Sequence, residues 1–507
     1  MSAAVDPRTG EALPLVAADS TEEEIDAVCA RAERAGAELA AIGRYGRAGM
    51  LEAMADALEE RRDRLVETAD RETALGAQRL GGELTRTEFQ LRLFAEVLRE
   101  GSYLEAIVDH AGPTAMGPRP DVRRILRPIG TVGVFGASNF PLAFSVPGGD
   151  TASALAAGCP VVAKVHPSHP ATCVLAHEAL LAGAGASGLA TAPVSLVFGV
   201  EAGAQLVGHA AVRAVGFTGS LAVGRLLADA AAARTSPIPF YGELGALNAV
   251  VVLPAAAAAR AEEIGHGLVA SFTLGVGQFC TKPGLVLVPR GVGGSELVEA
   301  LVSAAGAVPA GVMLGPSIAS RFSERVAEIA ASPGIAVLAR GGSPTLEGSA
   351  SGTPAVVRAD VGALRGIVLE ECFGPMLVVA TYDGAGELAT LLDLLEPALT
   401  ATVHAEPQDE GEARDVLDTL VARVGRIVWN GYPTGVAVSW AMHHGGPYPA
   451  TTSSLHTSVG ATAIRRWLRP VAYQDVPEQI LPEELRDFPG AGASVPRRVD
   501  GMLVLPG

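Results

Sequence analysis

Cysteine is scarce in this chain, with five residues among 507, at positions 29, 159, 173, 280 and 372. The set is odd in number and scattered, and it holds no Cys-x-x-Cys pair, so it fits neither a disulfide framework nor a zinc site. No apolar run reaches the roughly 18 residues that a membrane helix requires. The first fifteen residues lack the basic and apolar regions of an export signal. We therefore expect reduced thiols, no bound metal, no membrane association and a cytoplasmic location.

Positive charge is also in short supply. Thirty-eight Lys and Arg stand against 55 Asp and Glu, which gives a formal net charge of −17. An acidic surface repels phosphate backbones, and this argues against nucleic acid as a partner. The length predicts roughly two to four domains, each large enough to build a hydrophobic core without staples.

The apolar pattern changes along the chain. Residues 20–100 are predicted to be helical, beginning with a capping box of Ser20 and Glu23 and including a helical repeat over 51–72. From about residue 121, short β-branched runs alternate with Ala-rich helical stretches, which predicts wound, mostly parallel sheets in two α/β domains. The expected strands are 131–136, 160–165, 193–199 and 214–219 in a first set, and 248–253, 284–289, 334–339, 376–382 and 426–430 in a second.

Two stretches, 340–375 and 430–458, lack such periodicity and are longer than ordinary connections in compact domains. We expect both to be irregular loops and candidate functional segments. Near the end of the chain, 498–506 is apolar enough to form a terminal strand at a subunit interface.

A candidate phosphate site lies at Gly219 and Ser220, between a predicted strand and an Ala/Leu-rich helix. Free N–H groups at a helix N-terminus favour anions, although a Ser before a helix is also its commonest cap. The glycines of 133–140 do not have the G-x-G-x-x-G spacing of the standard dinucleotide fingerprint. An ordinary Rossmann site is therefore not predicted.

Three further residues suggest carbonyl chemistry. Cys280 stands in a loop bounded by glycines, where it is either a thiol nucleophile or a small buried side chain. Glu243 lies between two glycines in an uncharged run, as a general base with a raised pKa or as a surface carboxylate. Asn139 follows a predicted buried strand, where its amide either stabilises an oxyanion or completes a turn.

Taken together, these motifs carry a family resemblance. The segments SNFPL (138–142), AKVHP (163–167), GFTGS (216–220), ELG (243–245), GQFC (277–280) and EECFGP (370–375) resemble, in order and approximate spacing, those of the aldehyde dehydrogenase superfamily. Residues 127–172 and 430–470 are most similar to the 2,5-dioxopentanoate (α-ketoglutaric semialdehyde) dehydrogenase branch. The resemblance implies a variant Rossmann cofactor domain, a catalytic domain and a small oligomerisation β element.

The implied boundaries follow the motifs. Residues 1–244 would form the cofactor-binding domain with its N-terminal helices, the region near 101–125 would belong to the oligomerisation element, and 245–440 would form the catalytic domain. Residues 441–507 would return to the cofactor domain and the oligomerisation tail. The family implies a homodimer or homotetramer.

Site roles are implied in the same way. Cys280 matches the catalytic thiol, Glu243 the base and Asn139 the oxyanion amide. The residues that match the cofactor-binding positions are Lys164, Gly219, Ser220, Glu371 and Phe373. Position 167, where NAD-preferring relatives often carry Glu, is Pro167, so no carboxylate there repels a 2′-phosphate and NADP should be accepted as well as NAD.

The implied activity is NAD(P)-dependent oxidation of 2,5-dioxopentanoate to 2-oxoglutarate through a cysteine thiohemiacetal and thioester. One alternative is an NADP-dependent aliphatic aldehyde dehydrogenase. A cofactor-free thiol hydrolase and a non-catalytic scaffold are the other classes that the same residues leave open.

Two residues have weaker signals. His444, on the second long loop, either relays protons with Glu243 or hydrogen-bonds the loop backbone, and the second is the commoner use of such an imidazole. Arg92, on a predicted helix, either clamps a substrate carboxylate or forms a solvated salt bridge, and the salt bridge is again the commoner case.

Overall fold

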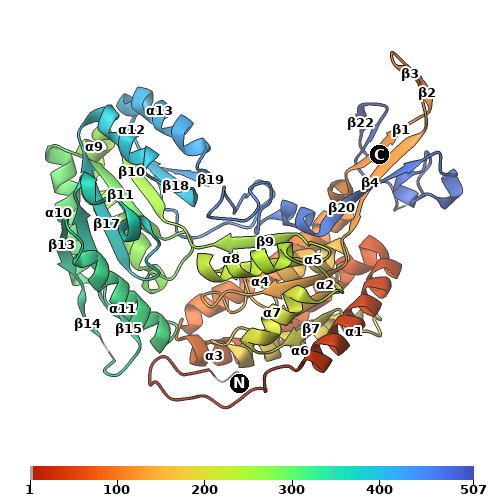
Figure 1. The fold of residues 1–507 in the computed structure, drawn as a ribbon, viewed down its shortest axis with the longest axis horizontal. Coiled ribbons are helices and arrows are strands. Elements are labelled where there is room, and N and C mark those ends of the chain that lie inside the picture. Colours follow the sequence, from red (N-terminus) through yellow and green to blue (C-terminus); the bar gives the residue numbers. More distant parts are fainter. Residues whose placement is uncertain (1–3, 345, 491, 507) are drawn as a thin grey trace.

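Three large β-sheets organise the chain. The structure, a computed structural model, describes residues 4–344, 346–490 and 492–506. Figure 1 shows one lobe built on a seven-stranded sheet, a second lobe built on a five-stranded sheet, and a third sheet that projects from the second lobe as an arm. Two wound α/β units and a small β element are what the sequence predicts.

The five-stranded sheet of the second lobe is wholly parallel, in the order β7-β6-β5-β8-β9. Its central strand β5 is buried along its whole length, as expected for a parallel sheet covered on both faces. The strands are β5 (Thr131–Phe135), β6 (Val161–Lys164), β7 (Val194–Val197), β8 (Val212–Gly219) and β9 (Phe240–Leu244), and the crossover helices are α5 (Gly149–Ala157), α6 (Pro170–Ala186), α7 (Val200–Gly208) and α8 (Leu221–Ala232).

The seven-stranded sheet has the order β13-β16-β17-β11-β10-β18-β19, and only its edge strand β13 runs antiparallel to its neighbour. Its strands are β10 (Asn248–Val252), β11 (Pro283–Pro289), β13 (Ile335–Arg340), β16 (Ala355–Ala359), β17 (Met376–Tyr382), β18 (Ala398–His404) and β19 (Val424–Trp429). Its helices are α9 (Pro254–Thr273), α10 (Val292–Ala307), α11 (Pro316–Ala330), α12 (Gly384–Asp393) and α13 (Glu410–Val421). A small sheet of β12 (Pro309–Val312), β14 (Gly342–Pro344) and β15 (Ser351–Gly352) lies beside it.

The arm joins segments far apart in the sequence. Its order is β20-β4-β1-β21-β22, and a short hairpin of β2 and β3 extends it (Figure 1). Met502, Leu503 and Leu505 near the C-terminal hairpin are exposed. The bounds are β1 (Ala106–Asp109), β2 (Gly112–Thr114), β3 (Gly117–Arg119), β4 (Val122–Pro128), β20 (Leu468–Gln474), β21 (Arg497–Val499) and β22 (Met502–Val504).

The N-terminal helices are α1 (Glu22–Ala41), α2 (Gly43–Glu59), α3 (Arg62–Thr73) and α4 (Ala77–Glu100). Two expectations about them were wrong. The capping box is formed by Thr21 and Glu24, because the Ser20 hydroxyl instead accepts from the Phe198 amide. The repeat over 51–72 is divided between α2 and α3, because Arg61 leaves helical geometry.

Strands that the sequence did not predict include β9, β16 and β18. Strand β16 lies inside 340–375, which is therefore not one irregular loop. The segment 430–458, in contrast, contains no helix or strand among the elements of the described chain. Within the same described residues, no helix combines the length and apolarity that crossing a membrane requires.

Candidate active site

Most of the site residues predicted from the sequence lie at the carboxyl edge of the parallel five-stranded sheet. Lys164 ends β6, Gly219 ends β8, and Glu243 lies one residue before the end of β9. The register places Gly219 beside Leu244 and Thr218 beside Glu243, so the predicted phosphate turn and the predicted base are neighbours across one strand pair. Parallel α/β sheets bind ligands at this edge.

Cys280 reaches this edge from the other lobe, on the loop between α9 and β11. Gly277 in that loop has φ +65°, and a Cβ added to it would meet the backbone of Gly374. The side-chain amide of Asn248 donates through Nδ2 to the Cys280 carbonyl at 2.8 Å. The two motifs GQFC and ECFGP are therefore packed backbone to backbone, which explains why glycine occurs in each of them.

Exposure separates Cys280 from the other thiols. It is partly exposed, whereas the remaining four cysteines are buried. Burial among apolar groups makes those four inert, and a nucleophile needs access to its substrate. Among the five cysteines, Cys280 is thus the one whose environment suits catalysis.

A histidine bridges the thiol and the carboxylate. The Nε2 atom of His444 lies 2.8 Å from Glu243 Oε1 and 3.5 Å from Cys280 Sγ. The Ser458 hydroxyl donates to the other carboxylate oxygen of Glu243 at 2.6 Å. The imidazole of His444 therefore contacts the candidate base instead of the loop backbone, which sequence reasoning considered the commoner case, and Ser458 is a site residue that it missed.

Hydrogen bonds between the backbones of β9 and the loop 430–458 hold His444 in this position. The loop 430–458 returns along the edge of β9, where the Leu244 amide donates to the Ala450 carbonyl at 2.8 Å and the Thr452 amide donates to Gly242 at 3.0 Å. Glu243 is itself bridged to Thr451. Only the length of this loop signalled its importance in the sequence.

Three side chains, those of Cys280, Glu243 and His444, form what is called the trio below. The charges around them indicate which group holds the proton at rest. Burial, followed by the negative charge of Glu243, raises the pKa of the Cys280 thiol well above its ordinary range. Burial alone would also raise the pKa of Glu243, but the charge and hydrogen bond of His444 and the bond from Ser458 outweigh it and leave that pKa lowered. The expected raised pKa of Glu243 was therefore wrong. At rest the thiol keeps its proton and a carboxylate lies ready to accept it.

Asn139 faces the same loop. Its buried side-chain Nδ2 donates to the Gln278 carbonyl at 2.8 Å, and its own carbonyl accepts from Arg79 Nη2 at 2.6 Å. One N–H of the side-chain amide is thereby engaged by the residue two positions before Cys280.

The residues predicted to hold the cofactor fit a dinucleotide. Ser220 caps α8 by accepting from the Val223 amide at 3.5 Å, which leaves the first amides of an exposed helix N-terminus for a pyrophosphate. Glu371 occupies the space that a side chain at Gly245 would fill. Its burial, opposed by Lys282 and reinforced by Glu243, raises its pKa to about 7. Phe373 follows, half-buried, in the same loop.

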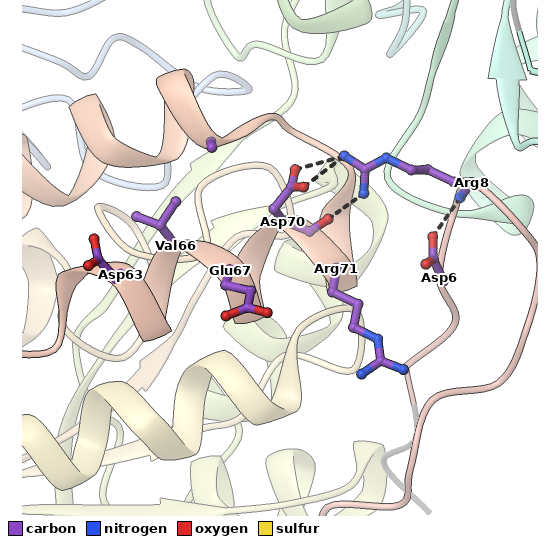
Figure 2. Close-up of a pocket in the computed structure, with 8 residues that line it drawn as sticks. Asp6, Arg8, Asp63, Val66, Glu67, Asp70 and Arg71 are labelled. Carbon is purple, nitrogen blue, oxygen red and sulfur yellow. Dashed lines mark hydrogen bonds and ion pairs between the residues drawn. The ribbon is translucent and has the colours of Figure 1, made fainter.

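Two features do not belong to this site. Arg92 is exposed and pairs with Asp56 at 2.7 Å, so the surface salt bridge is the correct interpretation. A surface pocket of about 450 Å³ lies between the N-terminal segment and α3, where Arg8 bridges to Asp70 at 2.8 Å (Figure 2). Its lining is mostly charged and holds none of the predicted site residues: Asp6, Arg8, Asp63, Val66, Glu67, Asp70, Arg71 and Ala77.

Comparison with known proteins agrees with this geometry. Residues 2–470 match the model of the Aldehyde dehydrogenase family. The chain belongs to that family. This aldehyde dehydrogenase is accordingly an NAD(P)-dependent oxidoreductase that acts on aldehydes.

Relatives cover almost the full length. The aldehyde dehydrogenase is 43% identical over 502 residues (98% of this chain, 95% of the relative) to "Alpha-ketoglutaric semialdehyde dehydrogenase 2" of Azospirillum brasilense. It is 40% identical over 488 residues (96% and 92%) to "Alpha-ketoglutaric semialdehyde dehydrogenase" of Acinetobacter baylyi.

Solved structures share its fold. A putative aldehyde dehydrogenase from Burkholderia cenocepacia superposes with a TM-score of 0.78 at 22% identity, over 94% of this chain and 96% of that one. Proline utilization A of Bradyrhizobium japonicum superposes with a TM-score of 0.77 at 24% identity, over 90% of this chain, which spans only 45% of that longer protein.

Proposed function

We propose that this aldehyde dehydrogenase oxidises 2,5-dioxopentanoate to 2-oxoglutarate. The assignment of this substrate rests on the near-full-length similarity to two proteins named for the same semialdehyde. The geometry supports the reaction class independently, because a partly exposed thiol, a carboxylate and an amide converge from both lobes.

The first step forms a carbon–sulfur bond. The reactive atoms of Glu243, Cys280 and His444 all lie within 4.8 Å of one another. The thiol is protonated and the carboxylate is ionised at rest, so the proton can pass from Cys280 to Glu243 as Sγ attacks the aldehyde carbon. The carbonyl oxygen becomes the oxyanion of a thiohemiacetal, which the Asn139 amide and the Cys280 backbone N–H stabilise.

His444 positions the base in this scheme. An ionised carboxylate only accepts hydrogen bonds, so its bond to His444 requires a proton on Nε2. The Nδ1 atom is buried and has no hydrogen-bond partner among the described residues. His444 thus orients Glu243 and keeps it ionised.

The cofactor would be held by Lys164, the Gly219–Ser220 turn, Glu371 and Phe373. When bound, this cofactor would supply the hydride acceptor that the oxidation needs, and Cys280 would then carry the acyl group as a thioester. After the proton from the thiol has left Glu243 for solvent, this carboxylate removes a proton from water and the water oxygen bonds to the acyl carbon. The carbon–sulfur bond then breaks, the acid leaves, and the sulfur takes the proton from Glu243. The net reaction consumes one aldehyde, one oxidised cofactor and one water.

The remaining assignments extend the same proposal. Pro167 places no carboxylate near a 2′-phosphate, which favours NADP in addition to NAD. The lobe built on the five-stranded sheet would bind the cofactor and the lobe built on the seven-stranded sheet would carry the thiol. The exposed apolar residues of the arm suit a subunit interface in a homodimer or homotetramer. We propose the cytoplasm as its location.

Initial rates of NADH and NADPH formation with 2,5-dioxopentanoate and hexanal test the proposal. We expect a large preference in kcat/KM for the dioxo acid, and loss of turnover with both aldehydes in Cys280→Ser. A preference for hexanal would instead identify an aliphatic aldehyde dehydrogenase. Full turnover in Cys280→Ser would remove the thiol from the mechanism.

A further inference from the structure

Arg86 on α4 has half of its guanidinium engaged and half of it without a partner. Its Nη1 donates to the carbonyl of Val436 in the loop 430–458. Its Nε and Nη2 atoms are buried and have no hydrogen-bond partner among the described residues. These two nitrogens form the side edge of the guanidinium, where two parallel N–H groups match the two oxygens of a carboxylate.

A second arginine approaches the same loop from the other lobe. Arg426 on β19 donates through Nη1 to Gly435 at 2.8 Å and through Nη2 to Pro433. Its Nε is also buried without a partner. Arg86 and Arg426 therefore hold neighbouring carbonyls of one short segment, and each has donor capacity left over.

Both guanidinium groups lie near the reactive thiol. Arg86 is close enough to Cys280 and Glu243 for their charges to interact, and Arg426 interacts in the same way with Cys280. The carbon Cζ of Arg86 lies 5.6 Å from the centre of the Phe144 ring, and the centre of the same ring lies 6.4 Å from that of the His444 imidazole. The Phe144 ring therefore has both the Arg86 guanidinium and the His444 imidazole as neighbours.

No acidic side chain among the described residues forms an ion pair with Arg86, although the negative charge of Glu83 acts on it and the Oε2 atom of Glu83 is buried without a hydrogen-bond partner. Glu83, one turn earlier on α4, accepts hydrogen bonds through Oε1 from the backbone amides of Leu142 and Ala143 at 2.7 and 2.9 Å. Glu243 is committed to His444 and Ser458. Burying unpaired N–H groups of a cation is costly, and a ligand that supplies the missing anion removes that cost.

We propose that Arg86, with Arg426 beside it, forms a subsite for the substrate carboxylate and so selects short aldehydes that carry an acid at the far end. The inference rests on the proposed function, which supplies such a substrate. In extended 2,5-dioxopentanoate the carboxylate carbon lies about 5 Å from the aldehyde carbon, given C–C bonds near 1.5 Å. A carboxylate held at Arg86 would therefore lie about 5 Å from the aldehyde carbon that Cys280 attacks.

The first test compares an anionic with an uncharged aldehyde. In Arg86→Met, the ratio of kcat/KM for 2,5-dioxopentanoate to that for pentanal should fall on the order of 10²-fold, mainly through KM for the dioxo acid. Arg86→Lys should keep part of the ratio, because it retains the charge but not the fork. Arg92→Met is the matched control on the same helix, and its exposed salt bridge predicts no change.

The second test does not depend on turnover of the dioxo acid. With pentanal as substrate, 2-oxoglutarate and glutarate should inhibit the wild-type enzyme competitively, and their inhibition constants should rise at least about tenfold in Arg86→Met and in Arg426→Met. Circular dichroism and cofactor binding show whether each variant is folded.

The outcomes separate the two hypotheses. Unchanged inhibition by both dicarboxylates in folded Arg86→Met and Arg426→Met, or an equal loss of kcat/KM for both aldehydes, would overturn the subsite and leave the proposed function standing. Arginine-dependent inhibition in an enzyme that does not oxidise 2,5-dioxopentanoate would support the subsite and discard that substrate.

Discussion

The Nε2 atom of His444 lies 2.8 Å from Oε1 of Glu243, although 201 residues separate them in the sequence. The contact reverses the effect of burial on the Glu243 carboxyl and keeps its pKa low. A general base that stays ionised at acidic pH is the consequence, and it can be tested by removing the imidazole.

His444→Gln should move the acid limb of the activity profile to higher pH. In the wild-type enzyme the lowered pKa of Glu243 keeps the base ionised until the pH falls below its ordinary value of 4.5. Without the imidazole, burial is opposed only by the remaining hydrogen bonds to the carboxylate, chiefly the one from Ser458, so Glu243 protonates at higher pH and activity is lost sooner as the medium is acidified. Measurements of kcat against pH decide this.

The matched control is His456→Gln, because that imidazole bonds Ser453 and not Glu243. Its acid limb should coincide with that of the wild-type enzyme. Coincidence of the His444→Gln limb with the wild-type limb would contradict the positioning role.

Glu243→Gln should separate acylation from deacylation. The amide fills the same volume but cannot take a proton from water, so steady-state turnover should fall about 10²- to 10⁴-fold. Rapid mixing and intact-protein mass measurement should show an acyl group retained on Cys280. Free, unmodified enzyme at steady state would instead mean that loss of Glu243 slows the first proton transfer from Cys280 more than it slows deacylation.

Asn139→Ala should lower kcat about 10²- to 10³-fold, the usual loss when one oxyanion donor is removed. The bond from Nδ2 to Gln278 at 2.8 Å is lost as well, so thermal unfolding must be recorded together with the rate. A loss of kcat without a matching loss of stability identifies the oxyanion role. Loss of stability alone would make Asn139 a turn residue.

Gly277→Ala should reduce both stability and activity. The position has φ +65° and the new Cβ would meet the Gly374 backbone, a strain of about 1–3 kcal/mol that also displaces the Cys280 loop. Gly348→Ala is the matched control, since Gly348 has φ +81° with nothing within 4 Å of its Cβ position. Denaturant midpoints and kcat should distinguish the two, and equal effects would show that the close approach is unimportant.

Local patterns predicted much of the fold because they reflect local physics. Buried parallel strands show as apolar β-branched runs, and β5, β6, β10, β11 and β17 fall where such runs predicted them. Strand β9 was missed because its five residues are interrupted by Gly242 and carry Glu243. The capping box was displaced by one residue because Ser20 and Thr21 suit the role equally in sequence, and only the Phe198 amide, 178 residues away, selects between them.

The sequence by itself determined which residues are available for chemistry: Cys280, Glu243 and Asn139 each stand in a short motif whose glycines and flanking strands are local features. Tertiary structure decided what those residues can do. It left Cys280 the partly exposed thiol, placed His444 against Glu243, and left the Arg86 guanidinium edge unpaired near the trio. The physical reason is that exposure, pKa and hydrogen-bond pairing depend on which distant segments meet, and one-dimensional spacing does not contain that information.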